Sequence, residues 1–182
     1  AIIVIALIIL PFAIYGYTHT GVYYNLDKSL PDDLPGVAAT NVLQEKFGIV
    51  STEVALVKND MPTNQMTEML NKIEEVEGIE WTLGYNKLAE LGIPKEALPE
   101  EILSIFENGD YQMIVINSKY EMATDELNHQ IDQNNTILKE YDEKAILAGE
   151  GPLMNDLVEI ADHDFNSVNI VSIAVILVIM IF

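Results

Sequence analysis

Two uninterrupted apolar runs lie at the ends of the chain, and the segment between them mixes apolar and polar residues. Residues 1–17 (AIIVIALIILPFAIYGY) contain no charge, and residues 168–182 (VNIVSIAVILVIMIF) contain only one asparagine and one serine as polar interruptions. Seventeen helical residues extend about 26 Å, which is nearly the thickness of the hydrocarbon core of a bilayer. We therefore expect truncated transmembrane helices over residues 1–17 and 166–182, with a folded domain over residues 18–165 between them.

A signal peptide or a buried core helix would fit the two apolar runs less well than membrane spans do. A signal peptide would carry a basic segment before its apolar run and a small-x-small cleavage site after it, and residues 1–17 show neither. A helix buried in a soluble domain normally keeps a polar stripe along one face, which residues 168–182 lack. Two membrane spans are therefore the better interpretation of the pattern.

The middle segment shows the periodicity of alternating helices and strands. The clearest helix is predicted over residues 63–77, where apolar residues recur at helical spacing and Gly78 follows. Further helices are predicted over residues 35–47, 86–91, 99–106, 124–140 and 152–165. Strands are predicted over residues 51–57, 79–85, 111–117 and 145–148.

The order of these elements indicates the fold class. A strand–helix–strand unit, an insertion and a second strand–helix–strand unit follow one another along the middle segment. This is the split βαβ pattern of a ferredoxin-like domain, in which helices cover one face of a four-stranded sheet. We therefore expect an α+β fold, with a ferredoxin-like domain between two transmembrane helices.

Particular residues are expected to begin and end the predicted helices. Asp32 or Asp33 can cap the helix that starts near Pro35, because a short acidic side chain accepts hydrogen bonds from the first free N–H groups. Gly48 is expected to end the same helix in the left-handed conformation. Thr124 is expected to cap the helix that begins after it.

The charge is confined to the middle segment. All 9 lysines and 29 acidic residues lie between Asp27 and Asp164, which gives this segment the whole formal net charge of −20. Such a surface repels a phosphate backbone, so nucleic acid is not an expected partner. The lysines nearest to the two apolar runs are Lys28 and Lys144. Because basic residues close to a span mark its cytoplasmic end, we expect the middle domain on the extracellular side of the cell membrane.

Two acidic segments could suggest a metal site. Asp162, His163 and Asp164 follow Glu159, but adjacent residues on a helix point about 100° apart and suit a hydrated juxtamembrane surface better. Residues 132–143 resemble a calcium loop but lack the glycine at its sharp turn and its ligand spacing. The chain has no cysteine, so a thiolate ligand or nucleophile is excluded. We therefore expect no catalytic, cofactor-binding or metal-binding residue, no cofactor and no enzyme activity.

Two further features have weaker functional interpretations. Asn134, Asn135 and Thr136 form a glycosylation sequon, but they lie inside a predicted helix. The seven methionines could line an adaptable apolar cleft. Met66 and Met69, however, are spaced as residues of a helix face and fit the core better. Neither feature by itself predicts a site.

Four segments together resemble one class of membrane transporter. Leu30-Pro31-Asp32-Asp33 follows the first apolar run and precedes a helix that ends at Phe47-Gly48, and a strand–helix–strand unit comes next. The segment 94–106 runs into Asp110-Tyr111, and residues 149–164 form a helix that continues into the second span. This layout resembles the first extracytoplasmic loop of transporters in the resistance-nodulation-division (RND) superfamily, in particular the MMPL branch (mycobacterial membrane protein large).

The resemblance implies a function as well as a porter-like fold. Similar proteins have many spans in two related halves, each with a large loop domain, and they export lipids, drugs or other amphiphiles by means of an ion gradient. The partners that it implies are the lipid bilayer, the remaining spans and second loop domain of the same protein, and an amphiphilic small-molecule or lipid substrate; it leaves a homo-oligomer open. The middle domain would then form part of the extracytoplasmic substrate pathway of a multi-pass cell-membrane protein.

The topology also fits two other classes of protein. A two-span sensor would hold a ligand-binding ectodomain between two helices, and a membrane-anchored secreted enzyme would hold a catalytic domain in the same place. The enzyme is disfavoured because the sequence shows no catalytic constellation. A sensor would carry a helical linker and a signalling domain after its second span, whereas a transporter would carry more closely spaced spans. On architecture and resemblance together, the transporter is the favoured hypothesis.

Overall fold

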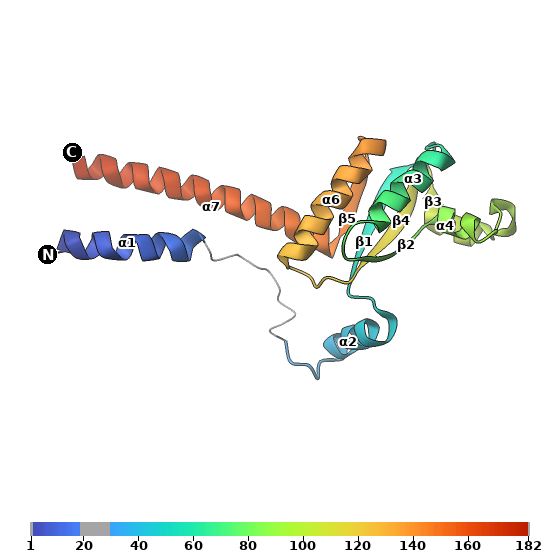
Figure 1. The fold of residues 1–182 in the computed structure, drawn as a ribbon, viewed down its shortest axis with the longest axis horizontal. Coiled ribbons are helices and arrows are strands. Elements are labelled where there is room, and N and C mark those ends of the chain that lie inside the picture. The colour runs from blue at the N-terminus through green and yellow to red at the C-terminus, as the bar shows by residue number, and fades with distance from the viewer. Residues whose placement is uncertain (1, 19–29, 182) are drawn as a thin grey trace.

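The computed structural model describes residues 2–18 and 30–181, whose helices and strands are labelled in Figure 1. Two helices, α1 (Ile2–Thr18) and α2 (Pro35–Phe47), precede the sheet domain, and α7 (Glu150–Ile181) follows it. The elements of the domain are β1 (Ser51–Lys58), α3 (Thr63–Glu74), β2 (Ile79–Leu83), α4 (Tyr85–Glu90), the 3₁₀ helix η2 (Lys95–Ala97), α5 (Glu100–Phe106), β3 (Glu107–Asn108), β4 (Tyr111–Ser118), α6 (Asp125–Tyr141) and β5 (Ile146–Gly149).

The sheet has the expected split βαβ topology. Its strand order is β2-β4-β1-β5, with β3 paired to β4 in addition, and every pair of neighbours is antiparallel. In the unit β1–α3–β2, the strand β4 lies between β1 and β2; in the unit β4–α6–β5, the strand β1 lies between β4 and β5. The α+β, ferredoxin-like fold class predicted from the element order is therefore confirmed.

The sheet differs from the prediction in having a fifth strand. β3 contains only Glu107 and Asn108, which pair with Gln112 and Tyr111 of β4. The turn between the two strands places Gly109 at a φ of 58°, a left-handed conformation that glycine adopts without the steric cost of a Cβ atom. A strand of two residues is too short to show an alternating pattern, which is why the sequence did not reveal it.

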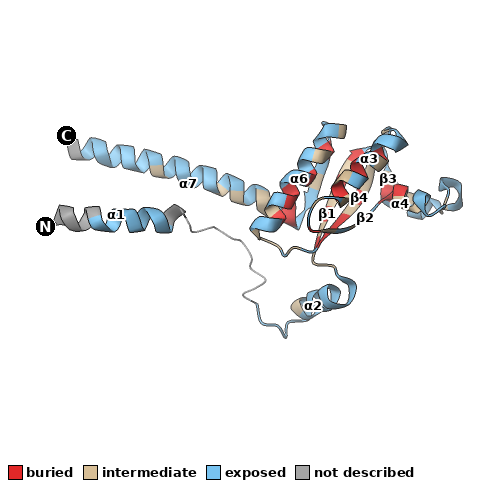
Figure 2. Cartoon of the chain, viewed as in Figure 1, coloured by how far each residue is buried: buried red, intermediate tan, exposed pale blue. Residues whose placement is uncertain are grey.

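One face of the sheet is covered by helices and the other is open. Along β1 every second residue, from Ser51 to Val57, is buried, and the residues between them are half-buried. The buried series faces α3 and α6, which lie side by side over the sheet (Figures 1 and 2). The core thus lies between the sheet and this pair of helices.

The covered face carries a buried apolar core. Met66, Met69, Leu70 and Ile73 of α3 are each at most 2% exposed and cluster with Leu138 of α6. Side chains of β1 and β4, namely Ala55, Val57, Ile114 and Ile116, complete the same cluster. The interpretation of Met66 and Met69 as core residues is confirmed.

The helix ends follow two of the three expectations. Gly48 ends α2 in the left-handed conformation with a φ of 65°, and its N–H donates to the carbonyl of Gln44. Thr124 caps α6, since its hydroxyl oxygen accepts a hydrogen bond from the Leu127 N–H at 3.3 Å. The expected cap of α2 by Asp32 or Asp33 is wrong. These residues lie in a turn closed by the Leu34 N–H, and Pro35 at the first helical position lacks an N–H that would need a cap.

The insertion between β2 and β4 is fastened to the domain by a few polar contacts and one aromatic side chain. Phe106 at the end of α5 is 8% exposed. The Lys87 ammonium of α4 contacts a carboxylate oxygen of Glu74 at 2.9 Å, and Lys95 of η2 forms an ion pair with Glu107 of β3. Partly exposed ion pairs of this kind contribute about 0–1 kcal/mol each, so the insertion is held more loosely than the core.

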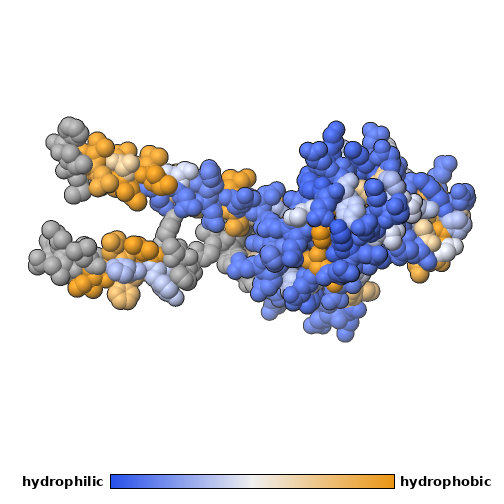
Figure 3. Space-filling view, turned by 45° about the horizontal axis from the view of Figure 1, so that its top comes forward, coloured by the Kyte–Doolittle hydropathy of each residue, from blue (hydrophilic) through white to orange (hydrophobic). Residues whose placement is uncertain are grey.

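The last helix runs without interruption from the edge of the sheet into the second apolar run. α7 has 32 residues, and its segment Glu150–Ile179 is, among the residues that the structure describes, the one helix long and apolar enough to cross a membrane. α1, with 17 residues, falls short of that length, and the first span remains a prediction. Figure 3 shows apolar residues gathered on the described parts of α1 and of the outer half of α7, whereas the face of the domain seen there is mostly polar, with smaller apolar patches.

Candidate functional site

A cleft lies between α2 and the loop that precedes α6. Its volume is about 650 Å³, which is within the range of small-molecule sites in proteins. Its apolar wall residues are Leu30, Leu34, Pro35, Val37, Val50 and Met122, and its polar ones are Thr40, Asn41, Gln44, Asp32 and Glu121. We call this space the α2 cleft.

Hydrogen bonds at both ends of the cleft fix its walls. The Asn117 side-chain amide on β4 donates to the carbonyl of Gly48 at 3.0 Å, which ties the end of α2 to the sheet. On the opposite wall the Thr124 hydroxyl donates to the carbonyl of Glu121 at 2.8 Å. Ala123, between them, adopts a φ of 56°, which an L-residue with a side chain rarely does. The loop that carries Glu121 and Met122 thus turns into α6 through a left-handed residue and one side-chain hydrogen bond.

The cleft also adjoins the start of α7. A Cβ atom added at the buried Gly151 would lie 3.2 Å from Ile131, 3.4 Å from Leu127 and 3.8 Å from the sulfur of Met122. Gly151 thus lets the backbone of α7 approach α6 and the cleft wall closely. Met122 contributes to both places, so the cleft and the attachment of α7 share a side chain.

The chemistry of the wall suits an amphiphile. Six apolar side chains provide a surface for a hydrocarbon body, and the polar wall includes the carboxylates Asp32 and Glu121. Among the described residues that line the cleft, none is basic. A neutral or cationic head group is therefore favoured there, whereas an anionic one would be repelled.

α2 extends this apolar surface beyond the cleft. Val42, Leu43 and Phe47 are 51%, 43% and 67% exposed, and of the residues described in α2 none is buried. In Figure 1 the helix lies beside the sheet domain rather than on it. Its burial pattern is that of a helix whose apolar side chains contribute a surface and not a core.

A second feature is a carboxyl group buried inside the domain. Glu53 of β1 is 0% exposed, and its Oε2 accepts a hydrogen bond of 3.1 Å from the side-chain amide of Asn134 on α6, which is also 0% exposed. Burial raises the pKa of the Glu53 carboxyl to about 7, and the hydrogen bond from Asn134 partly opposes that shift. Within the described chain, neither Glu53 Oε1 nor Asn134 Oδ1 has a hydrogen-bond partner.

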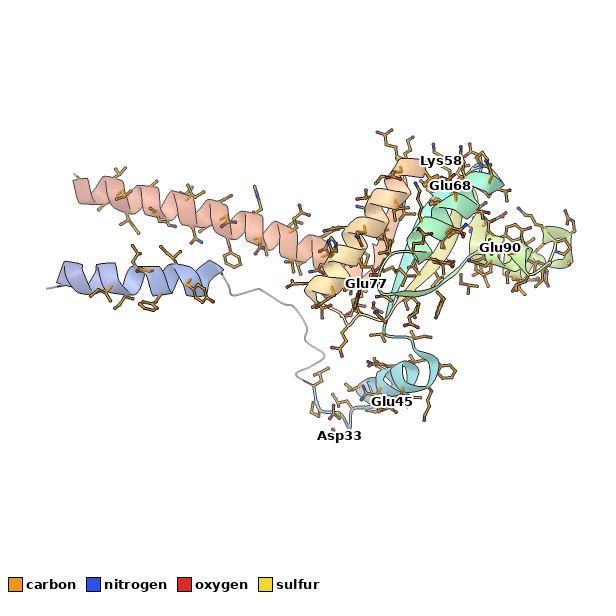
Figure 4. All side chains as sticks on the ribbon, in the orientation of Figure 1. Asp33, Glu45, Lys58, Glu68, Glu77 and Glu90 are labelled. Atoms are coloured by element: carbon orange, nitrogen blue, oxygen red, sulfur yellow. The ribbon has the colours of Figure 1, made fainter. Side chains whose placement is uncertain are left out.

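The two acidic segments that could suggest a metal site do not form one among the residues that the structure describes. Asp162, His163 and Asp164 lie exposed along α7, and residues 132–141 are part of the helix α6 rather than of a loop. Over residues 2–18 and 30–181 no group of three or more histidine, aspartate or glutamate side chains could hold a metal ion. Figure 4 labels acidic side chains at separate places in the chain: Asp33 in the turn before α2, Glu45 on α2, Glu68 on α3, Glu77 between α3 and β2, and Glu90 on α4.

The structure separates the remaining candidates by burial. Asn134 of the sequon is buried and bonded to Glu53, so an oligosaccharide could not be attached to it in the folded domain. Of the methionines, Met66 and Met69 are in the core, whereas Met122 lines the α2 cleft. Glu53 was not predicted from the sequence, although one signal was present: it occupies a position on the buried face of a predicted alternating strand.

Comparison with known proteins identifies a family. A family model described as the MMPL family matches residues 45–182. The matched segment begins near the end of α2 and contains the whole sheet, α6 and α7. A search of curated proteins found no match.

Proposed function

Because the chain belongs to the MMPL family, we propose that it is part of an RND-type exporter of lipids, drugs or other amphiphiles, and that the α2 cleft belongs to its extracytoplasmic substrate pathway. Proteins of the MMPL family are membrane transporters, and α7 supplies one helix able to cross a membrane. In this proposal residues 1–17 and 166–182 belong to two spans and residues 18–165 form the domain outside the cytoplasm.

The observation that carries the proposal is the composition of the α2 cleft. A cavity of about 650 Å³ with an apolar wall, two carboxylates and no basic side chain among its described lining residues accommodates an amphiphile better than a small polar metabolite. The cleft adjoins the start of α7, the helix that in this proposal continues into the membrane. An ion gradient, a second loop domain and the remaining spans would complete the exporter.

A sensor remains the second hypothesis, since a continuous helix from sheet to membrane would also transmit a ligand signal. Membership of a transporter family favours the exporter. The two hypotheses share the ligand-binding step but differ in whether the ligand moves, so ligand binding and transport must be measured separately.

The binding step can be tested with a fluorescent label in the cleft. The chain contains no cysteine, so Thr40→Cys in the full chain in lipid nanodiscs offers a single thiol for an environment-sensitive fluorophore. Glu68→Cys, on an exposed position of α3 outside the cleft, is the matched control. We expect dodecyltrimethylammonium to give a saturable blue shift at position 40 and not at position 68.

The charge preference provides a sharper test of the same cleft. Dodecyl sulfate, which has the same apolar chain, should bind more weakly than dodecyltrimethylammonium. In an Asp32→Asn, Glu121→Gln variant the ammonium compound should lose about tenfold in affinity, or about 1.4 kcal/mol. Equal responses at positions 40 and 68, or a preference for the sulfate, would show that the cleft is not the ligand site.

A further inference from the structure

Glu53 occupies the joint between the sheet, α6 and α7. It lies on the covered face of β1, opposite Gly149 of β5, and α7 begins at the residue after Gly149. Gly149 has a φ of 139°, and a Cβ atom there would lie 3.0 Å from the Thr52 carbonyl oxygen and 3.4 Å from the Glu53 Cα. The backbones of β1 and β5 therefore approach closely where α7 begins.

The hydrogen bonding of this carboxyl group is incomplete in its ionised form. A carboxylate only accepts hydrogen bonds, and Asn134 supplies one, from its Nδ2 to Oε2. The remaining oxygens of the pair, Glu53 Oε1 and Asn134 Oδ1, have no donor within the described part of the chain. Glu53 Oε1 and Asn134 Oδ1, each without a hydrogen-bond donor among the described residues, and the buried negative charge of Glu53 all cost desolvation free energy.

One proton would act on all three penalties. Placed on Oε1, it would neutralise the carboxyl group and provide a donor for Asn134 Oδ1, so that a second hydrogen bond would join the observed one in a ring between a carboxylic acid and a primary amide. We propose that Glu53 and Asn134 form a proton-binding site within the extracytoplasmic domain, in which the proton holds α6 against β1 beside the start of α7.

The surrounding side chains supply no alternative charge partner. On the covered face, Glu53 is opposite Ile116 of β4 and Gly149 of β5, both uncharged. The charged and histidine side chains of the two helices packed against it are exposed: Asp125, Glu126, His129, Asp132, Lys139 and Glu140 on α6, and Glu150, Asp156, Glu159, Asp162, His163 and Asp164 on α7. Tyr141 at the end of α6 is half-buried, at the opposite end of the helix from Asp125. Within the described residues no ion pair involves Glu53. The proton is therefore the cation that the site can bind without rearrangement.

Release of the proton has a structural consequence. The ionised carboxylate must then gain water or a donor, which requires α6 to move away from β1. Since α7 starts at this joint, the attachment of the membrane helix becomes dependent on pH. The raised pKa, about 7, places the change within the range of ordinary pH differences across a membrane. The proton site does not depend on export, because it belongs to the domain alone.

Infrared difference spectroscopy of the full chain in nanodiscs tests the site directly. The spectrum at pH 5 minus that at pH 9 should contain the carbonyl band of a buried carboxylic acid, titrating with a midpoint near pH 7. Glu53→Gln should abolish this band, whereas Glu68→Gln on the exposed face of α3 should leave it unchanged. A midpoint near the ordinary value of 4.5, or a band that survives in Glu53→Gln, would overturn the proposal.

A second variant tests the role of Asn134 and does not require Glu53→Gln to fold. In Asn134→Leu the acid loses its amide partner, so its carbonyl band should move to higher frequency while remaining present. Amide hydrogen exchange, corrected for intrinsic rates, should show faster exchange in α6 and the start of α7 above pH 8 than below pH 6 in the wild type. A band of unchanged frequency in Asn134→Leu, or exchange in these segments that does not respond to pH, would contradict the acid–amide ring.

Discussion

The two ends of the covered sheet face are built from the same strands and helices but differ in chemistry. Near Lys58, β1 and α6 contribute Val57 and Leu138 to a buried cluster of apolar side chains. Near Ser51, the same two elements contribute Glu53 and Asn134, and the buried side chains there include Gln130 and Ser118. We call these the apolar half and the polar half.

The contrast between the halves separates the groups that stabilise the domain from those that can respond to its surroundings. The apolar half gains free energy from burial, which depends little on pH. The polar half contains buried oxygens without partners among the described residues, on Ser51, Glu53, Gln130 and Asn134. It also adjoins α7 and the α2 cleft. A domain made only of the apolar half would lack the Glu53–Asn134 pair.

The largest expected effect is a loss of packing in the apolar half. Leu138 is 0% exposed, so Leu138→Ala should lower the free energy of unfolding by about 2–5 kcal/mol, and equally at pH 5 and pH 8. Urea unfolding followed by the fluorescence of Trp81, the single tryptophan, measures this. Leu91→Ala, at a residue that is 77% exposed, is the control and should change little. If Leu138→Ala lowered the free energy of unfolding only at pH 8, the apolar half would depend on pH as the polar half does, and the proposed difference between the halves would be wrong.

The second-largest expected effect is a pH dependence of the free energy of unfolding, which arises from Glu53 in the polar half. The pKa of Glu53 is raised from 4.5 to about 7 in the folded state, so the folded protein binds a proton that the unfolded chain releases between these values. The contribution of Glu53 to the free energy of unfolding should therefore be largest at and below pH 4.5, fall by about 3 kcal/mol between pH 4.5 and pH 7, and change no further above that. Glu53→Gln should remove that part of the slope, so the stability difference between variant and wild type, measured from pH 4.5 to 8.5, isolates it. Parallel curves for the two proteins would mean that Glu53 titrates normally.

The smallest effect concerns the start of α6 beside the polar half. Thr124→Ala removes the side-chain cap of Leu127 N–H and should lower the free energy of unfolding by about 1 kcal/mol. Thr136→Ala, at an exposed position in the middle of the same helix, is the matched control and should be neutral or slightly stabilising. If both variants lost the same amount, the cap would contribute nothing specific to this end of α6.

The sequence predicted the elements well because their periodicity is local. The strand over residues 51–57 and the helix over residues 63–77 correspond to β1 and α3, and the resemblance to the MMPL branch is confirmed by the family match. The cap at Asp32 or Asp33 failed because it depends on the turn geometry before Pro35, which spacing alone does not determine.

The two candidate sites could not be predicted because each depends on tertiary placement. The α2 cleft joins Thr40 to Met122, residues far apart in the chain, and the acid–amide pair joins Glu53 to Asn134. A buried glutamate shows in the sequence only as a charged residue among alternating apolar ones. Its partner Asn134 stands out in the sequence for a different reason, as part of a sequon, and its burial excludes that interpretation.

Because α7 is one continuous helix, a small tilt at the sheet would produce a large displacement at the other end of the helix. A helix of 32 residues is about 48 Å long, and it begins directly after β5 with no flexible loop between them. Such a helix acts as a lever with its fulcrum at Gly149: a tilt of about 5° at the sheet would displace its far end by about 4 Å. The backbone packs closely at Gly149 and Gly151, which leaves little space for α7 to shift independently of the sheet, so a tilt of the domain would also tilt the helix.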